Sequence, residues 1–139
     1  MSWLINTNVV SEMRKGSRAD PAIAAWFADM GDDDVYTSVL VIGEIRRGIA
    51  SIRRRDHEAA QALERWLARV IEDQGGRVLP IDLAIAEAWG RLNVPDPLSV
   101  VDGLLAVTAK VHGLTLVTRN VGDVERSGVP CLNPFAAAG

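Results

Sequence analysis

The chain has 139 residues, of which 48% are hydrophobic and 24% charged, and its formal net charge is −3. This length predicts one globular domain over residues 1–139 that needs no disulfide or structural metal, and the charge argues against a strongly basic nucleic-acid binder. A single cysteine, Cys131, together with no signal-peptide pattern and no long apolar run, predicts a cytoplasmic protein without a membrane segment.

Hydrophobic periodicity changes repeatedly along the chain between that of a strand and that of a helix. In chain order, the predicted elements are a strand at 3–5, helices at 9–15 and 21–30, a turn at 31–34, a strand at 35–37, a helix after residue 38, a long helix from 56 to 72, a strand at 78–81, a helix to 92, a loop with two prolines at 95 and 97, a helix at 100–112, a strand at 114–117 and an edge strand at 129–132.

Polar and glycine residues mark where these helices begin and end. Asn8, Ser38 and Asp82 each precede an amphipathic segment, and we expect them to be N-caps. Gly75 and Gly113 follow helical segments and are predicted to end their helices, Gly75 in a left-handed cap.

Alternating strands and helices at these spacings predict an α/β fold, a three-layer α/β/α sandwich with a central parallel sheet. Right-handed crossovers bring the carboxyl ends of all its strands to one edge. Ligands bind at that edge in open α/β sheets, so we search there for functional residues.

Four positions are expected to meet at this edge: Asn6, Glu44, Asp102 and Asp123. Three of them are carboxylates from separate segments, and a cluster of like charges is unfavourable unless a cation neutralises it or one member is protonated. Hard oxygen ligands favour Mg²⁺ or Mn²⁺. Two histidines and one cysteine provide no zinc ligand set.

Each carboxylate also has a purely structural explanation. Asp102 and Ser99 match the capping-box spacing, Glu44 is placed to pair with Arg47 on an exposed helix face, and Asp123 is placed to cap a turn. The sequence leaves these alternatives open for each residue, and only their predicted convergence favours a site.

A divalent cation held by carboxylates suggests phosphoryl chemistry, and guanidinium groups suit phosphate oxygens. The chain supplies arginines at 46, 47, 53, 54, 55 and 119. A solvated face, or a surface for an acidic protein partner, explains the same arginines equally well.

Four stretches taken together resemble the PIN-domain ribonuclease toxins, and most closely the VapC toxins of VapBC toxin–antitoxin systems, including the FitB-like branch. They are LINTNVVSE at 4–12, Ser38-Val39 with GEIRRG at 43–48, DGLLA at 102–106 and TLVTRNVGD at 115–123. They occur in the order of the family and span almost the whole chain.

The resemblance implies a compact PIN-like α/β/α sandwich that binds Mg²⁺ or Mn²⁺ and cleaves RNA. It implies a homodimer and a cognate VapB-type antitoxin, which inserts a segment into a groove of the toxin and contacts DNA for autoregulation. Carried over by position, the metal and catalytic residues are Asn6, Glu44, Asp102 and Asp123. Supporting polar groups carried over in the same way are Thr7, Ser38, Thr118 and Asn120.

The sequence departs from the family at Asn6, where the family has an aspartate. An amide has nearly the same size as a carboxylate but no charge, so metal affinity and catalysis are expected to fall. Two explanations are open: a deliberate or selected inactivation of a toxin that harms the cell producing it, or an asparagine that is natural in a degenerate member of the family.

Three functions are therefore compared. The first is a metal-dependent endoribonuclease toxin attenuated by Asn6. The second is a catalytically inactive module that binds its antitoxin in a DNA-bound autoregulatory complex. The third, a phosphotransfer domain, needs an aspartate after the first strand and a lysine at a strand tip, whereas Lys15 and Lys110 fall on predicted helices.

Overall fold

A five-stranded parallel sheet forms the centre of the protein in the computed structural model, which describes residues 2–30, 34–94 and 98–136. The strands are β1 (Trp3–Ile5), β2 (Val35–Ser38), β3 (Val78–Leu79), β4 (Thr115–Val117) and β5 (Cys131–Leu132). Their order across the sheet is β3-β2-β1-β4-β5, and every neighbouring pair is parallel. The predicted α/β/α class is confirmed.

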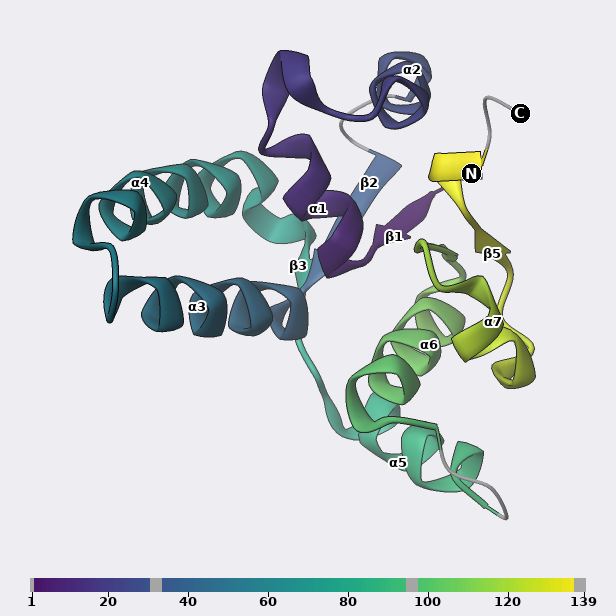
Figure 1. The fold of residues 1–139 in the computed structure, drawn as a ribbon. Helices are drawn as coiled ribbons and strands as arrows, with labels where there is room; N and C mark the ends of the chain where they lie inside the picture. Colours follow the sequence, from purple (N-terminus) through teal and green to yellow (C-terminus); the bar gives the residue numbers. More distant parts are fainter. Residues whose placement is uncertain (1, 31–33, 95–97, 137–139) are drawn as a thin grey trace.

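Helices flank this sheet as two groups (Figure 1). Along the chain, the first group, α1–α4, comes before β3, and the second group, α5–α7, comes between β3 and β5. The α-helices are α1 (Thr7–Met13), α2 (Pro21–Asp29), α3 (Val39–Arg53), α4 (His57–Gln74), α5 (Leu83–Leu92), α6 (Val100–His112) and α7 (Val121–Val124). Short 3-10 turns are η1 (Gly16–Arg18), η3 (Gly75–Arg77), η4 (Glu125–Ser127) and η5 (Pro134–Ala136).

The core lies where β1 meets its neighbours. Leu4 is fully buried and is in register with Tyr36 of β2 and Leu116 of β4. Val41 of α3 and Leu105 of α6 are also fully buried. Burial of this central strand between two helix groups explains its continuous apolar sequence.

Two of the three predicted N-caps are confirmed and one is wrong. Ser38 and Asp82 accept backbone N–H bonds at the starts of α3 and α5. Asn8 is not a cap, because α1 begins at Thr7, two residues before the predicted start at residue 9, and Asn6 is its N-cap. The first residue after β1 is polar and already caps α1.

Other differences from the sequence prediction are local. The third strand ends at Leu79 rather than residue 81, because Pro80 has no N–H for the ladder. The predicted edge strand is confirmed at Cys131–Leu132. Gly113 ends its helix as predicted and is left-handed. Gly75 also follows its helix, but the left-handed cap predicted there is wrong, because its φ of 54° and ψ of −125° lie outside the left-handed helical region.

Two predicted segments fall partly or wholly outside the described residues, namely the turn at 31–34, except residue 34, and the prolines of the 95–97 loop. Within the described part of the chain, no helix combines the length and apolarity needed to cross a membrane.

Candidate functional site

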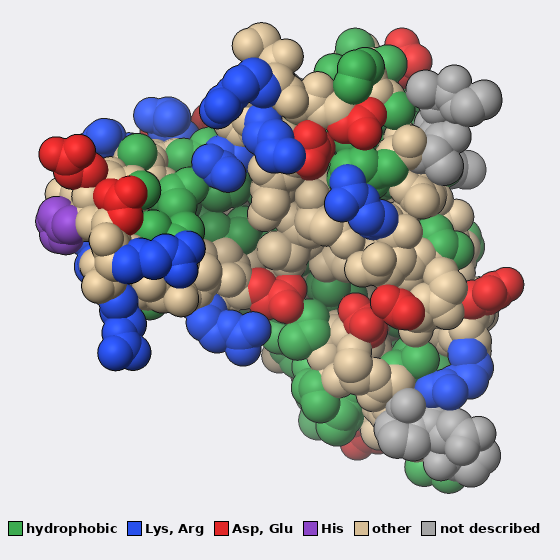
Figure 2. All heavy atoms as spheres, viewed as in Figure 1, with side chains coloured by type: hydrophobic (Ala, Val, Ile, Leu, Met, Phe, Trp, Pro, Cys, Tyr) green, Lys and Arg blue, Asp and Glu red, His purple; other side chains and the backbone are tan. Residues whose placement is uncertain are grey.

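An open pocket of about 570 Å³ lies at the carboxyl end of β1, the edge that the topology singles out. It is built from the start of α1, the second turn of α3, the start of α6 and the segment after β4. The lining residues are Asn6, Thr7, Asn8, Glu44, Ser99, Val100, Val101, Asp102 and Asn120. Acidic side chains are visible near the middle of the face drawn in Figure 2.

Asn6 is held by hydrogen bonds on both sides of its amide. Its Oδ1 accepts from the Thr7 N–H at 2.7 Å, and its Nδ2 donates to Thr118 Oγ1 at 3.0 Å. The residue is only 9% exposed, and its backbone N–H donates to Val117 in β4. Asn6 therefore joins β1, α1 and the end of β4 at the inner wall of the pocket.

Thr118 is the centre of a small polar network behind Asn6. Its Oγ1 accepts from Asn6, from the Asn120 backbone N–H at 3.2 Å and from Asn8 Nδ2 at 3.5 Å. Thr118 is 2% exposed, so these bonds form away from bulk water. The network sets the shape of the pocket wall at the ends of β1 and β4.

Glu44 enters the pocket from α3, one turn after the Ser38 cap. Its Oε1 accepts from the Thr7 hydroxyl at 2.5 Å, which connects α3 to the start of α1. The alternative pairing with Arg47 is not formed among the described contacts, and Glu44 is partly buried. The carboxylate thus points to the strand tip rather than along its own helix.

Asp102 enters from the first turn of α6. Its Oδ2 accepts from the Ser99 hydroxyl at 2.7 Å, so the predicted contact between these two residues is present. Ser99 makes no side-chain bond to the helix backbone, however, and the pair is therefore not a complete capping box. Both side chains line the pocket instead.

Asp123 is the one predicted site residue that does not line this pocket. It lies exposed in the short helix α7, and Asn120, three residues earlier, occupies the pocket wall. Within the described residues, no group of three acidic, histidine or cysteine side chains is arranged to hold a metal ion.

The donor set fits a hard divalent cation incompletely. Glu44 and Asp102 offer carboxylate oxygens, and neither is in an ion pair among the described residues. The third position, Asn6, offers an amide oxygen that already accepts from Thr7. These are the ligand atoms that Mg²⁺ and Mn²⁺ prefer, with one negative charge fewer than three carboxylates would give.

The arginines expected to steer an anionic substrate are partly occupied. Arg46 and Arg53 both pair with Glu64 across α3 and α4, the latter at 3.4 Å. The Arg119 guanidinium lies 3.7 Å from the centre of the Phe135 ring. Most of the basic side chains seen in Figure 2 lie over the part of the molecule formed by α1, α3 and α4.

Cys131 lies apart from the pocket on the edge strand β5. Burial raises the pKa of its thiol, and nearby Glu125 acts in the same direction. The thiol donates to the Val129 carbonyl oxygen at 3.3 Å. A protonated, hydrogen-bonded thiol is a poor nucleophile, which agrees with a structural role.

Asn8 and Ser99 are predicted from the sequence only as helix caps, yet both line the pocket. The feature of the sequence that indicates a pocket position is their closeness to Asn6 and Asp102. A cap and a pocket-lining residue use the same side chains at helix starts, so the sequence pattern does not separate them.

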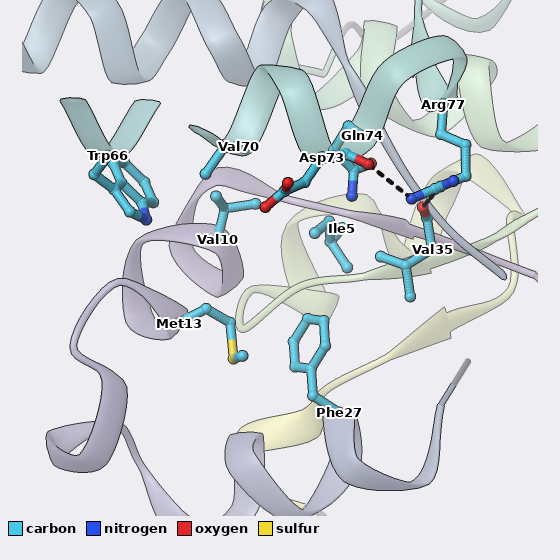
Figure 3. A pocket seen from close by; sticks show the side chains of 10 residues that line it. All are labelled: Ile5, Val10, Met13, Phe27, Val35, Trp66, Val70, Asp73, Gln74 and Arg77. Carbon is cyan, nitrogen blue, oxygen red and sulfur yellow. Dashed lines mark hydrogen bonds between the residues drawn. The ribbon is translucent and has the colours of Figure 1, made fainter. Parts of the chain in front are cut away.

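A second groove of about 520 Å³ lies between α1, α2, β2 and α4 (Figure 3). We call it the apolar groove after the seven apolar side chains among its ten lining residues, although three polar residues at and just after the end of α4 also line it. Its lining residues are Ile5, Val10, Met13, Phe27, Val35, Trp66, Val70, Asp73, Gln74 and Arg77. Arg77 is held by the carbonyl oxygens of Val35 and Asp73, each at 3.2 Å. Gln74 Oε1 is buried without a hydrogen-bond partner among the described residues.

Comparison with known proteins gives one family match. The sequence model of the PIN domain matches residues 4–122. Among curated proteins, the toxin FitB of Neisseria gonorrhoeae is 28% identical over an alignment of 139 positions that covers 95% of this chain and 97% of FitB. The VapC ribonuclease Y4jK of Sinorhizobium fredii is 29% identical, covering 97% of this chain and 99% of the relative.

Solved structures show the same similarity in three dimensions. The crystal structure of FitAcB from Neisseria gonorrhoeae matches with a TM-score of 0.88 at 28% identity, over 96% of this chain and 99% of the other. The structure of FitAB bound to an IR36 DNA fragment matches with a TM-score of 0.86 at 27% identity, over 96% and 95%.

Proposed function

Because the chain belongs to the PIN domain family and is related to the VapC and FitB toxins, we propose that it is the toxin of a type II toxin–antitoxin pair, a metal-dependent endoribonuclease attenuated by Asn6. One observation carries the proposal: Asn6, Glu44 and Asp102, from three separate elements, line one open pocket. We further propose that residues 1–139 form a single cytoplasmic PIN domain.

In this proposal Glu44 and Asp102 hold the cation directly, with residue 6 as the third position. Asp123, which lies outside the pocket lining, contributes through water or at a second cation. A bound Mg²⁺ or Mn²⁺ supplies a polarised phosphate oxygen and a water of lowered pKa. Thr7 and Ser99 orient the two carboxylates through their hydroxyls, which donate to Glu44 and Asp102.

An aspartate at position 6 is compatible with its surroundings. The Thr7 N–H can still donate to the first oxygen, and the Thr118 hydroxyl has its own proton to donate to the second. The change from asparagine therefore reverses one hydrogen bond and adds a negative charge to the pocket. This makes Asn6→Asp the most direct test of the nuclease proposal.

The test measures RNA cleavage and Mn²⁺ affinity in the parent chain and in Asn6→Asp. We expect Asn6→Asp to bind Mn²⁺ at least about tenfold more tightly and to cut RNA in Mg²⁺ or Mn²⁺ where the parent cuts little. Asn8→Asp adds the same charge to the same pocket at a position held toward the Arg119 N–H, and it should not restore cleavage. In the Asn6→Asp protein, Asp102→Ala should abolish both properties.

The second candidate is a catalytically inactive module that binds its antitoxin and acts in a DNA-bound autoregulatory complex. Asn6 favours it, since both ends of its amide are engaged in structural hydrogen bonds. If Asn6→Asp cleaves no RNA with either cation, this second function replaces the first.

For the partner, we propose that a cognate VapB-type antitoxin occupies the apolar groove between α1, α2, β2 and α4 with an inserted segment. Trp66 and Val70 offer apolar contact area there, and Gln74 Oε1 lacks a donor that a partner backbone could supply (Figure 3). DNA contact is then indirect, through the antitoxin, and the toxin itself forms a homodimer or a hetero-oligomer with it.

A further inference from the structure

The first turn of α6 packs unusually closely against α5. A Cβ atom added at Gly103 would lie 3.2 Å from both Cδ1 and Nε1 of Trp89, and 3.7 Å from Cβ of Leu98. Every other glycine in the described part of the chain has open space at this position. Gly103 is buried inside a regular helix and needs no positive φ, so what disfavours a larger residue there is the close approach of Trp89, which would have to shift by a few tenths of an ångström to admit a Cβ.

Trp89 reaches this contact at a cost. Its Nε1 is buried and has no hydrogen-bond partner among the described residues. A buried, unpaired N–H is unfavourable and requires an explanation in a folded protein. The edge of the indole ring that carries Nε1 lies against Gly103. The Trp89 side chain therefore packs closely on α6, and its N–H makes no hydrogen bond among the described residues.

Asn93 fixes the same region from the loop side. Its Nδ2 donates to the Trp89 carbonyl oxygen at 2.8 Å, and its Oδ1 accepts from the Leu98 N–H at 2.9 Å. The end of α5 is thereby connected to the residue that precedes Ser99. This single side chain joins the two ends of the loop that leads into α6.

The Trp89–Gly103 contact and the hydrogen bonds of Asn93 both act on residues close to Asp102. Gly103, which touches Trp89, is its neighbour in sequence, and the Gly103 N–H donates to the Ser99 carbonyl oxygen at 2.9 Å. Ser99 in turn donates its hydroxyl to Asp102 Oδ2. The first turn of α6 is therefore held by Trp89 on one side and by Asn93 through Leu98 on the other.

We propose that Trp89, assisted by Asn93, is the positioning residue for Asp102: the α5 side chain sets where the first turn of α6 lies and so where the carboxylate meets the pocket. The inference rests on the proposed function, in which Asp102 holds the cation. Residues that orient a metal ligand without touching the metal commonly affect its affinity.

The test compares Gly103→Ala with Gly90→Ala, a matched change in α5 where the added Cβ meets nothing. Two quantities are measured: Mn²⁺ affinity by calorimetry in the Asn6→Asp background, and hydrogen-exchange protection of the residue-103 amide without metal. Gly103→Ala should weaken Mn²⁺ binding by about ten- to a hundredfold and lower the protection, whereas Gly90→Ala should change neither.

Relief of the contact should restore both quantities in part. Trp89→Leu removes the indole edge, so the Gly103→Ala/Trp89→Leu protein should recover part of the affinity and protection lost in Gly103→Ala, whereas Trp89→Leu alone, which leaves Gly103 without its packing partner, should lower both relative to the parent. General loss of stability does not predict this recovery, because Trp89→Leu by itself removes packing. If Gly103→Ala does not fold, Asn93→Asp serves instead: it retains the acceptor for Leu98, places a carboxylate oxygen where the donor to the Trp89 carbonyl oxygen was, and should weaken Mn²⁺ binding in protein that circular dichroism shows to be folded.

Equal results for Gly103→Ala and Gly90→Ala, or no recovery in the double variant, would overturn the proposal. Asp102→Asn separates it from the proposed function. If Asp102→Asn leaves Mn²⁺ affinity unchanged, Asp102 is not a ligand and the metal-site proposal fails. The exchange measurement needs no metal, so it decides in either case whether Trp89 sets the first turn of α6.

Discussion

Thr118 shows how one hydroxyl can organise a polar pocket wall. Three N–H groups, from Asn6, Asn8 and Asn120, point to its oxygen. None of these donors is adjacent to another in sequence, and Asn6 is 112 positions away from Thr118. The geometry of the wall therefore depends on a residue that has no charge and no direct role in chemistry.

Thr37 provides a matched comparison for this hydroxyl. It is 1% exposed, as buried as Thr118, but its Oγ1 has no hydrogen-bond partner among the described residues. Thr118→Val leaves the Asn6 amide unpaired, and we expect it to lower the free energy of unfolding by about 1–3 kcal/mol. Thr37→Val removes only an unpaired group and should be neutral or stabilising. Urea denaturation measures both, and equal losses would contradict the assigned role of Thr118.

Glu12 predicts a pH dependence at the junction of α1 and α2. Hydrogen bonds from the Lys15 ammonium and from the Asp20 backbone N–H, in that order of importance, lower the pKa of its carboxyl below the ordinary 4.5. The two donors lie 3.0 Å and 2.8 Å from its oxygens. A lowered folded-state pKa means that the ionised carboxylate stabilises the fold above its unfolded-state pKa, and that this contribution is lost as pH falls through the folded-state value.

Glu12→Gln should therefore reduce the loss of stability on acidification from about pH 7 to about pH 3. Lys15→Met, which removes the first donor, should reduce it in part. Urea denaturation at the two pH values measures the effect, and an unchanged difference in Glu12→Gln would count against it.

At the scale of elements, the N-cap of α3 is the clearest link between sequence and site. Ser38 ends β2, is fully buried, and accepts from the Leu40 N–H at 3.0 Å. It fixes where α3 begins, and hence the height at which Glu44 meets Thr7 one turn later. Ser38 thus supports the pocket from outside its lining.

Ser38→Ala should destabilise the protein by about 0.5–2 kcal/mol, because the first turn of α3 loses its side-chain acceptor. Ser51→Ala is the control, since Ser51 is exposed in the last turn of the same helix and alanine has the higher helix propensity. Thermal and urea unfolding should separate the two, and a Ser38→Ala protein as stable as Ser51→Ala would show that the cap contributes nothing.

The elements and their order could be predicted because each has its own hydrophobic periodicity and is bounded by residues that start or end helices. Ser38 and Asp82 show this for helix starts, and Gly113 for a helix end. Asn8 shows the limit: three consecutive cap-forming residues leave the helix start ambiguous by two positions. Pairing with β4 ends β1 at Ile5, and this makes Asn6, rather than Asn8, the N-cap of α1.

The pocket was predicted less completely than the fold. Parallel topology is enough to bring Asn6, Glu44 and Asp102 to one edge, but not to decide whether Asp123 reaches it. Its direction depends on the turn from Asn120 into α7, which carries no periodic signal. The packing of Trp89 on Gly103 was likewise invisible, because contact between two helices depends on tertiary geometry.

At the scale of the whole molecule, the polar pocket and the apolar groove lie on different sides of the strand tip of β1. Ile5 lines the groove and Asn6 lines the pocket, so adjacent side chains of alternating direction separate the two surfaces. A partner in the groove therefore lies within one residue of the proposed cation site.

Val70→Asp should weaken antitoxin binding at least about tenfold, because a carboxylate that must be desolvated on binding replaces an apolar contact in the groove. Ala68→Asp adds the same charge at an exposed position of α4 that does not line the groove, and should bind normally. Calorimetry with the product of the adjacent open reading frame measures both. Equal affinities for the two variants would place the antitoxin elsewhere.

The central position of β1 also has a consequence for the order in which the protein can form on the ribosome. β1 is made first, but one of its two neighbours, β4, spans residues 115–117, and Asn6 needs the hydroxyl of Thr118. During synthesis β1 can pair with β2 early, but it lacks its second neighbour, β4, until most of the chain has emerged. A translation product that stops short of residue 118 lacks the inner wall of the pocket, so incomplete chains are expected to lack the proposed cation site.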